Sequence, residues 1–382
     1  MRPFKFVVIV AGEASADLHA SNLVKVMKQW EPGIVFWGIG GKKMEEAGVK
    51  LILSSSDMAV VGLTEAFSKF RTLARASKQL KYILKNARPD LLILLDYPGF
   101  NIHIAKAAKQ FHVPVLYYIA PQVWAWRRGR VKKIARRVNH MAVILPFEEE
   151  FFKNSGINVD YVGHPILDCI AQKNTSPQIE QNFPVIGIVP GSRREEIRNL
   201  LPVMIRSAEI LENHYGGIKC LLPLAPTIDA EFVQSFIDSS NVSINITVCR
   251  NSIYDVLSSC DIAMVTSGTA TLETAVMGIP MVIVYKVSPI SYWLAKKVIK
   301  TSFIGLVNLV AGEKVVPELI QYEATPERLA EEVLNILENQ GVIDIMKNKM
   351  KYVKESLGNA GASEKTAQIA IKMIRQQLKQ SG

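Results

Sequence analysis

The sequence predicts an α/β protein with two domains, each built around a parallel sheet. Apolar runs of four to six residues alternate with helix-length segments along almost the whole chain, which is the pattern of repeated βαβ units. The 382 residues exceed what a single hydrophobic core usually holds. We therefore expect two Rossmann-like domains whose sheets face a central cleft, with ligands at the carboxyl ends of the strands.

The apolar runs define the expected strands. In the first half they lie at residues 6–11, 34–38, 49–53, 90–95, 115–119 and 140–144. In the second half they lie at residues 185–189, 219–223, 244–248, 262–265 and 280–284. Near the C-terminus, 326–337 and 342–378 are predicted to be helices.

A polar stretch at 173–183 contains Pro177 and precedes a new strand, which is typical of a linker. The expected domains are therefore residues 1–172, with a basic, aromatic surface, and residues 173–341. Residues 342–382 form a final helix that we expect to cross back to the first domain.

Composition favours a cytoplasmic protein. With 49% hydrophobic and 21% charged residues, the chain resembles an ordinary globular protein. The four cysteines form no C-x-x-C pair and have no histidine at metal-ligand spacing, as expected in a reducing compartment. No apolar run approaches the roughly 20 residues that span a bilayer. The first apolar run is interpreted as a strand rather than a secretory signal.

The net charge of +10 lies entirely in the first half. Residues 1–170 contain 24 Lys and Arg against 14 Asp and Glu, whereas residues 171–382 contain 21 of each. We expect the first half to meet an anionic partner.

Two small-residue turns in the second half favour a diphosphate. Gly191-Ser192-Arg193 and Ser267-Gly268-Thr269 each follow an apolar strand and precede a helix. A helix start offers free backbone N–H groups and a positive dipole end to an anion, and an arginine adds bidentate contacts. The alternative is that both are ordinary strand-to-helix turns, because such turns are common.

Further along the second half, Glu273 is a candidate to accept ribose hydroxyls and Asn308 to contact a base or ribose edge. No D-x-D pair occurs in the chain, so the sequence does not support a metal that bridges the diphosphate. We predict no metal and no cofactor.

Two carboxylates in the first half are candidate catalytic groups. Asp96 ends a buried strand and precedes Pro98 and Gly99, which favour a sharp turn. At this position Asp96 can serve as general base toward a hydroxyl or simply cap the next helix. Glu13 also stands at a strand end, where the helix dipole alone would favour it. His164 either contacts a phosphate or a sugar, or is held by backbone hydrogen bonds.

Basic and aromatic residues cluster in two regions, 58–88 and 117–137. Seven cations and no acid lie in residues 127–137. Each region alone fits a solvated helix face, but together they favour an anionic membrane surface, with nucleic acid as the rival. No recognised nucleic-acid motif accompanies them. The candidate residues that face this surface are Phe67, Phe70, Trp124, Trp126, Arg127, Arg128 and Arg130.

Eight blocks in order resemble the lipid-A-disaccharide synthase family of GT-B glycosyltransferases, over nearly the whole chain. They are GEASADLHA (12–20), DYPGFN (96–101), YYIAPQVWAWRRGR (117–130), VGHP (162–165), PGSRREEI (190–197), SGTATLE (267–273), YWLAKKVIKT (292–301) and NLVAGEKVVPELIQ (308–321). Three residues depart from the family pattern. Ala16 stands where the family usually has Gly, Gln122 where it often has Ser, and Val307 where it usually has Pro.

The resemblance implies inverting transfer of 2,3-diacylglucosamine from UDP-2,3-diacylglucosamine to the 6-hydroxyl of 2,3-diacylglucosamine 1-phosphate. It implies that residues 1–172 bind the acylated acceptor at their basic, aromatic surface and that residues 173–341 bind the UDP donor. It also implies a peripheral location on the inner face of the inner membrane in Gram-negative bacteria, and a homodimer that exchanges C-terminal segments. The alternatives are another GT-B UDP-sugar enzyme, of the peptidoglycan glucosaminyltransferase or UDP-sugar 2-epimerase type, and a non-catalytic basic protein that binds membrane or nucleic acid.

Overall fold

The computed structural model describes residues 4–54, 65–124, 128–171, 183–250, 252–288, 292–293 and 301–381. The chain forms two compact units. The first contains residues 1–168 together with 359–382, and the second contains residues 169–358. Most of the expected linker, 173–183, lies outside the described residues.

The first unit is built on a parallel sheet with strand order β3-β2-β1-β4-β5-β6-β7. Its strands are β1 (Lys5–Ala11), β2 (Ile34–Gly40), β3 (Val49–Ser54), β4 (Leu91–Leu95), β5 (Val115–Tyr118), β6 (His140–Val143) and β7 (Val159–Tyr161). The all-apolar β4 is buried along its whole length, as expected for a strand covered on both faces.

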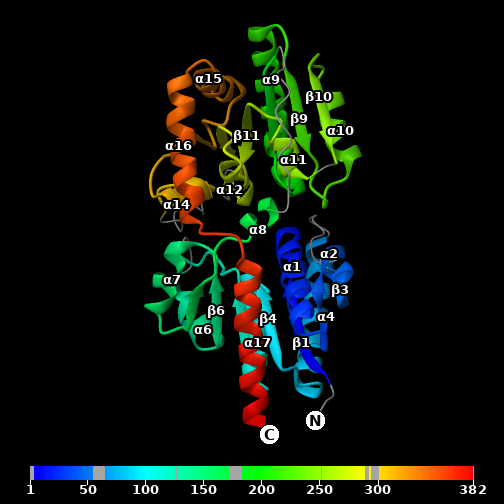
Figure 1. The fold of residues 1–382 in the computed structure, drawn as a ribbon. Helices are drawn as coiled ribbons and strands as arrows, with labels where there is room; N and C mark the ends of the chain where they lie inside the picture. Colours follow the sequence, from blue (N-terminus) through cyan, green and yellow to red (C-terminus); the bar gives the residue numbers. More distant parts are fainter. Residues whose placement is uncertain are drawn as a thin grey trace. The chain divides into compact units, whose positions relative to one another are not determined.

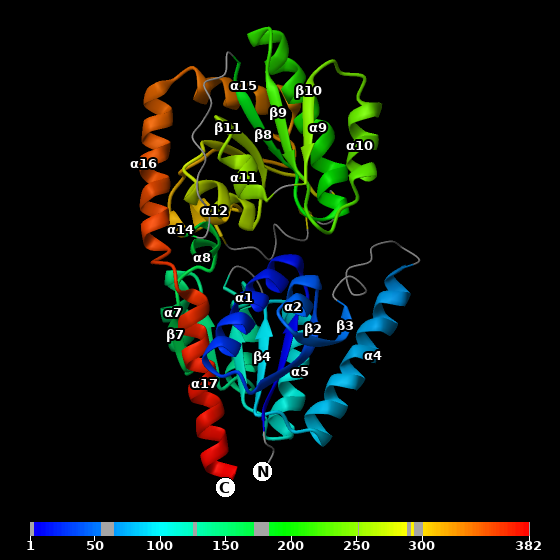
Figure 2. The same ribbon diagram turned by 45° about the vertical axis from the view of Figure 1, so that its right-hand side comes forward.

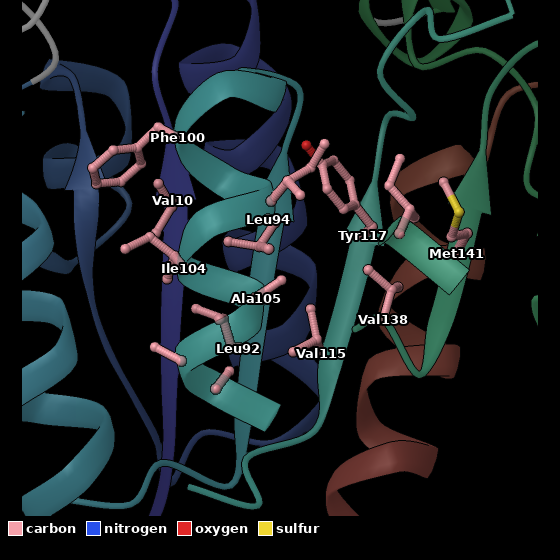
Figure 3. Close-up of a cluster of buried hydrophobic side chains, with 14 of the residues drawn as sticks. Val10, Leu92, Leu94, Phe100, Ile104, Ala105, Val115, Tyr117, Val138 and Met141 are labelled. Carbon is pink, nitrogen blue, oxygen red and sulfur yellow. The ribbon is translucent and has the colours of Figure 1, made fainter. Parts of the chain in front are cut away.

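The helices of the first unit, except α17, follow strands of its sheet along the chain (Figure 1). They are α1 (Ala14–Trp30), α2 (Lys42–Glu46), α4 (Glu65–Asn86), α5 (Pro98–Gln110), the 3₁₀ turn η1 (Arg128–Arg130), α6 (Val131–Ala135), α7 (Pro146–Lys153), α8 (Ile166–Ala171), which extends into the second unit, and α17 (Ala362–Ser381). Figure 3 shows Ile104 and Ala105 of α5 beside Leu92 and Leu94 of β4, in the core that fixes α5 on the sheet.

The C-terminal segment is not the single helix predicted for 342–378. One helix, α16 (Gln340–Ser356), ends before Gly358 and Gly361, whose φ angles are 84° and 110°. A left-handed backbone stops a helix, and glycine adopts it without a steric cost. The carboxylate of Asp168 then accepts hydrogen bonds from the backbone N–H groups of Gly361 and Ser363 at 2.6 and 3.0 Å. It thereby caps α17, which packs on α1.

The second unit repeats the plan, with a parallel sheet of strand order β10-β9-β8-β11-β12-β13 (Figure 2). Its strands are β8 (Val185–Val189), β9 (Lys219–Pro223), β10 (Asn245–Cys249), β11 (Ile262–Thr266), β12 (Met281–Tyr285) and β13 (Glu318–Ile320). Besides α16, its helices are α9 (Arg194–Tyr215), α10 (Ala230–Ser239), α11 (Ile253–Leu257), α12 (Thr269–Val276), α14 (Leu306–Ala311) and α15 (Pro326–Leu337).

The predicted α/β class with two parallel sheets is confirmed. Every expected strand is present, with ends shifted by at most two residues. The strands β7 and β13 were not predicted, because each is only three residues long and lies at the edge of its sheet. None of the helices among the described residues combines the length and the apolar character needed to cross a bilayer.

Candidate active site

The backbone is strained where β4 ends. Asp96 and Tyr97 have φ angles of 43° and 42°, so two consecutive non-glycine residues are left-handed. Such residues cost about 1–3 kcal/mol each and are concentrated at functional sites. The turn lies at the carboxyl end of a central strand, where parallel sheets bind ligands.

Buried side chains hold this turn in place. The hydroxyl of Tyr117 donates to the backbone carbonyl of Asp96 at 2.6 Å. The amide of Asn101, itself buried, donates to the carbonyls of Leu95 and Asp96 at 2.9 and 2.8 Å. The Asp96 carboxylate therefore stands on a backbone that is fixed from both β5 and α5.

The structure brings the two candidate carboxylates to neighbouring strand ends. Ala11 of β1 pairs with Leu95 of the parallel strand β4. Glu13 follows Ala11 by two residues, and Asp96 follows Leu95 directly. Glu13 occupies the N-cap position of α1 without a side-chain capping bond. Burial, and next the charge of Glu13, raise the pKa of Tyr97, which places Glu13 close to the strained turn.

Trp124 is not the membrane-facing group that the sequence predicted. Trp124 is only 7% exposed, and its indole donates from Nε1 to the buried carboxylate of Glu148 at 2.9 Å. It also packs edge-on against Phe147, with ring centroids 4.9 Å apart. A buried indole needs an acceptor for its N–H, and Glu148 supplies it from α7.

Burial raises the pKa of Glu148 from 4.5 to about 7, against the hydrogen bonds from Trp124, Leu145 and Ile144 that lower it. The negative charge of Asp96 raises it further. Glu148 thus binds Trp124 through a hydrogen bond and lies near enough to Asp96 to be affected by its charge.

The other candidates of the basic, aromatic regions are only partly described. Trp126 and Arg127 lie outside the described residues, as do the side chains of Phe67, Phe70 and Arg128. Arg130 is half-buried, and its charge lowers the pKa of the Tyr117 hydroxyl, although burial keeps that pKa well above its usual value. Arg130 is therefore near the group that holds Asp96.

For His164, the structure favours the interpretation that backbone hydrogen bonds hold the side chain over the interpretation that it contacts a phosphate or a sugar. Its ring is 1% exposed, and its Nδ1 accepts from the backbone N–H of Ile166 at 3.2 Å. Burial lowers the pKa of His164 to about 3 and that of His19 on α1 to about 4. Both rings are neutral at physiological pH, which does not suit phosphate binding.

In the second unit, the turn after β8 already holds a carboxylate. Gly191 has a φ of 113°, and α9 begins just beyond Arg193. Glu196 accepts hydrogen bonds from the backbone N–H groups of Ser192 and Arg193 at 3.1 and 3.2 Å and from the Arg193 guanidinium at 3.1 Å. The N–H groups predicted to bind a diphosphate therefore lie together, but in this structure they donate to the carboxylate of Glu196.

The turn after β11 is open. Gly268, with a φ of 149°, precedes α12, and a Cβ added to it would meet no described atom within 4 Å. Thr269 is the first residue of α12, and the hydroxyl of Ser267 donates to the carbonyl of Ile304 at 3.0 Å. An anion can approach this backbone closely.

Glu273 lies on α12, one turn beyond this opening. It accepts a hydrogen bond from the Tyr254 hydroxyl at 2.9 Å, and burial raises its pKa. Tyr254 therefore orients the Glu273 carboxylate.

Asn308 is completely buried, and its amide is saturated by protein groups. Its Nδ2 donates to the carbonyl of Val316 and to Glu318 at 3.0 and 2.8 Å, and its Oδ1 accepts from Val315 and Val316. Glu318 also accepts from the backbone N–H groups of Ile304 and Gly305, both at 2.9 Å. Asn308 thus orders the start of α14 and, through Ile304, the Ser267 turn; this geometry favours a positioning role over direct reading of a base.

A family model for lipid-A-disaccharide synthetase matches residues 7–373. This chain belongs to the lipid-A-disaccharide synthetase family. A lipid-A-disaccharide synthase of Geobacter metallireducens is 46% identical over 378 residues, which cover 97% of this chain and 98% of that protein. One of Coxiella burnetii is 39% identical and covers 97% and 99%. The family resemblance found in the sequence is confirmed.

Solved structures agree with the GT-B fold of this synthetase family member. A UDP-N-acetylglucosamine 2-epimerase from Listeria monocytogenes, described as putative, has a TM-score of 0.67 at 11% identity and covers 95% of this chain and 94% of its own. The calicheamicin glycosyltransferase has a TM-score of 0.62 at 13% identity, with 98% and 99% covered. At such low identity the likeness concerns the fold alone.

Sequence reasoning missed several residues of this family site. Glu318 lies inside the block 308–321 that carried the resemblance, so its position was signalled but not its partner. Glu148 and Tyr254 gave no local signal, because their partners are 24 and 19 residues away. No group of three or more metal-ligating side chains is present in the described part of the chain.

Proposed function

We propose that this chain transfers 2,3-diacylglucosamine from UDP-2,3-diacylglucosamine to the 6-hydroxyl of 2,3-diacylglucosamine 1-phosphate. The products are the β-1,6-linked disaccharide 1-phosphate and UDP. The observation that carries the proposal is the family match over residues 7–373. The matched range contains Asp96, whose carboxylate stands on a fixed turn at the end of a central strand.

In the proposed mechanism, Asp96 accepts the proton of the acceptor hydroxyl as its oxygen attacks the anomeric carbon. The bond from that carbon to the UDP oxygen breaks on the opposite face, so the configuration inverts. The anomeric centre passes through an oxocarbenium-like state. The strained turn supports this role because a general base must be held in place. Glu13, at the neighbouring strand end, is the second candidate base or an acceptor-positioning group.

The second unit supplies the donor contacts in this proposal. The open turn Ser267-Gly268-Thr269 directs the start of α12 toward the departing diphosphate, and Arg193 neutralises its charge. Glu273 accepts ribose hydroxyls. Gly191 and Ser192 provide backbone contacts once Glu196 moves away. No step in this mechanism requires a metal.

The experiment is an assay of UDP release from UDP-2,3-diacylglucosamine, with and without acceptor, in detergent. We expect acceptor-dependent release and disaccharide formation. Replacing Asp96 by Asn should abolish turnover while UDP binding and thermal stability stay unchanged. UDP release without disaccharide, or full activity of the Asp96→Asn variant, would contradict the mechanism.

The proposed function also predicts attachment to the inner face of the inner membrane, through the basic first half. Sedimentation with vesicles of phosphatidylglycerol, compared with neutral vesicles, tests this.

A homodimer with exchanged C-terminal segments is a further part of the proposal, since Gly358 and Gly361 give the chain a bend just before α17. Light scattering of the purified protein would contradict it by showing a monomer at all concentrations.

A further inference from the structure

A small basic cavity of about 180 Å³ lies in the first unit beside the strained turn. It is lined by the first residues of α5 and by cations from η1, α6 and the segment after α6. The polar and backbone contributors are Pro98, Gly99, His103, Arg130, Lys133 and Arg137. None of the lining residues that the structure describes is acidic.

His103 reports a positive potential at this cavity. Its pKa is lowered by burial and then by the charges of Lys81, Lys106 and Arg137. The Nε2 atom of His103 lies 2.9 Å from the Nζ atom of Lys81. The Lys81 ammonium donates this hydrogen bond to the imidazole, and the cations around the cavity would attract a bound anion.

The cavity is adjacent to the candidate base. Pro98 and Gly99 follow Asp96 by two and three residues. Arg130 acts electrostatically on Tyr117, whose hydroxyl bonds to the Asp96 carbonyl. A group held in the cavity is therefore close to the place where the acceptor hydroxyl must lose its proton.

We infer that this cavity binds the phosphate monoester of the acceptor sugar, so that the opposite end of the sugar reaches Asp96. The inference rests on the proposed function, since the proposed acceptor carries its phosphate on C1 and reacts through its 6-hydroxyl. Lysine and arginine side chains suit a dianionic phosphate through charge-assisted hydrogen bonds. The start of α5 adds a favourable dipole. The cavity then selects phosphorylated acceptors over neutral ones.

A pair of neighbouring lysines provides a matched test. Lys133 lines the cavity, whereas Lys132 does not, and both are exposed on α6. Lys133→Ala should raise the KM for the phosphorylated acceptor about tenfold or more, as the loss of one charged contact to a phosphate does. The KM for the donor and the kcat should not change. Lys132→Ala should match the wild type, and both variants should match it with a dephosphorylated acceptor.

Equal kinetics of the Lys133→Ala and Lys132→Ala proteins with the phosphorylated acceptor would overturn the inference. A lipid headgroup is the other source of phosphate. If Lys133→Ala lowered binding to phosphatidylglycerol vesicles but left the preference for phosphorylated acceptor intact, the acceptor assignment would be wrong.

Calorimetric titration with glucosamine 1-phosphate keeps this test separate from that of the proposed function. If the wild type formed no disaccharide, that result would contradict the proposed reaction but not the phosphate site. Weaker binding to Lys133→Ala than to Lys132→Ala would still support a phosphate site, whereas equal binding would overturn it.

Discussion

The Tyr117 hydroxyl donates a 2.6 Å hydrogen bond to the backbone carbonyl of Asp96, so a residue of β5 fixes the turn that carries the candidate base. Tyr117 is fully buried, and Asp96 and the following residue are both left-handed. The bond therefore acts on a backbone that would relax without support.

Replacing Tyr117 by Phe should lower kcat about tenfold, because a small displacement of a general base is costly. Stability should fall by only about 1 kcal/mol, the usual net value of one hydrogen bond. Steady-state kinetics and urea unfolding measure the two effects. Tyr118→Phe is the control, since neighbouring strand residues point to opposite faces of the sheet. If both variants lost the same activity, the Tyr117 hydroxyl would have no particular role at the turn.

Gly191→Ala should weaken UDP binding about tenfold and destabilise the protein by about 1–3 kcal/mol. The added Cβ would lie 2.3 Å from the Glu196 carboxylate oxygen, at a φ of 113°. Gly216→Ala at the other end of α9 separates the two causes, because Gly216 is also left-handed but has open space around it. We expect that variant to lose stability alone. Calorimetric UDP titration decides, and equal affinities of the two variants would contradict a role of the Gly191 turn in donor binding.

The fold and the places of the candidate site could be predicted from the sequence, since both depend on local patterns. Apolar runs mark the strands, and Asp96 and Gly268 follow them directly. The break between α16 and α17 was also visible as Gly358 and Gly361, but the helical periodicity on both sides outweighed it. The edge strands were too short to give a signal.

The environments of the site residues could not be predicted, because they depend on long-range partners. Trp124 belongs to a basic, aromatic segment that is typical of a surface, yet its indole is buried against Glu148. Asn308 was a candidate to contact a base or ribose edge, yet β13 and the segment before it saturate its amide. In both cases the deciding partner comes from another element.

Asn308→Asp tests whether this residue positions the loop or contacts the nucleotide. A carboxylate here would face that of Glu318, now 2.8 Å from the amide, and lose two donated hydrogen bonds. We expect a loss of about 2–3 kcal/mol of stability together with weaker UDP binding. The exposed Asn339→Asp, at the N-cap position of α16, is the control for the change in charge and should be neutral. Weaker UDP binding at unchanged stability would instead indicate direct contact with the nucleotide.

Glu148 should make stability depend on pH in one definite direction. Burial raises its pKa from 4.5 to about 7 in the folded protein, so the folded state binds its proton more tightly than the unfolded state does. Its contribution is complete below pH 4.5 and is lost as the pH rises through about 7. The lowered pKa values of His19 and His164 act in the opposite direction, so wild-type stability alone does not isolate the effect of Glu148.

The difference in unfolding free energy between the wild type and Glu148→Gln isolates it, because both histidines are common to the two proteins. We expect this difference to shift against the wild type between pH 4.5 and 7 and to level off above pH 7. Urea unfolding at half-unit pH steps measures it. A difference that is flat across this range, or that moves in favour of the wild type as the pH rises, would show that the Glu148 carboxylate does not bind its proton more tightly in the fold. Glu148 would then hold Trp124 as an ordinary ionised carboxylate.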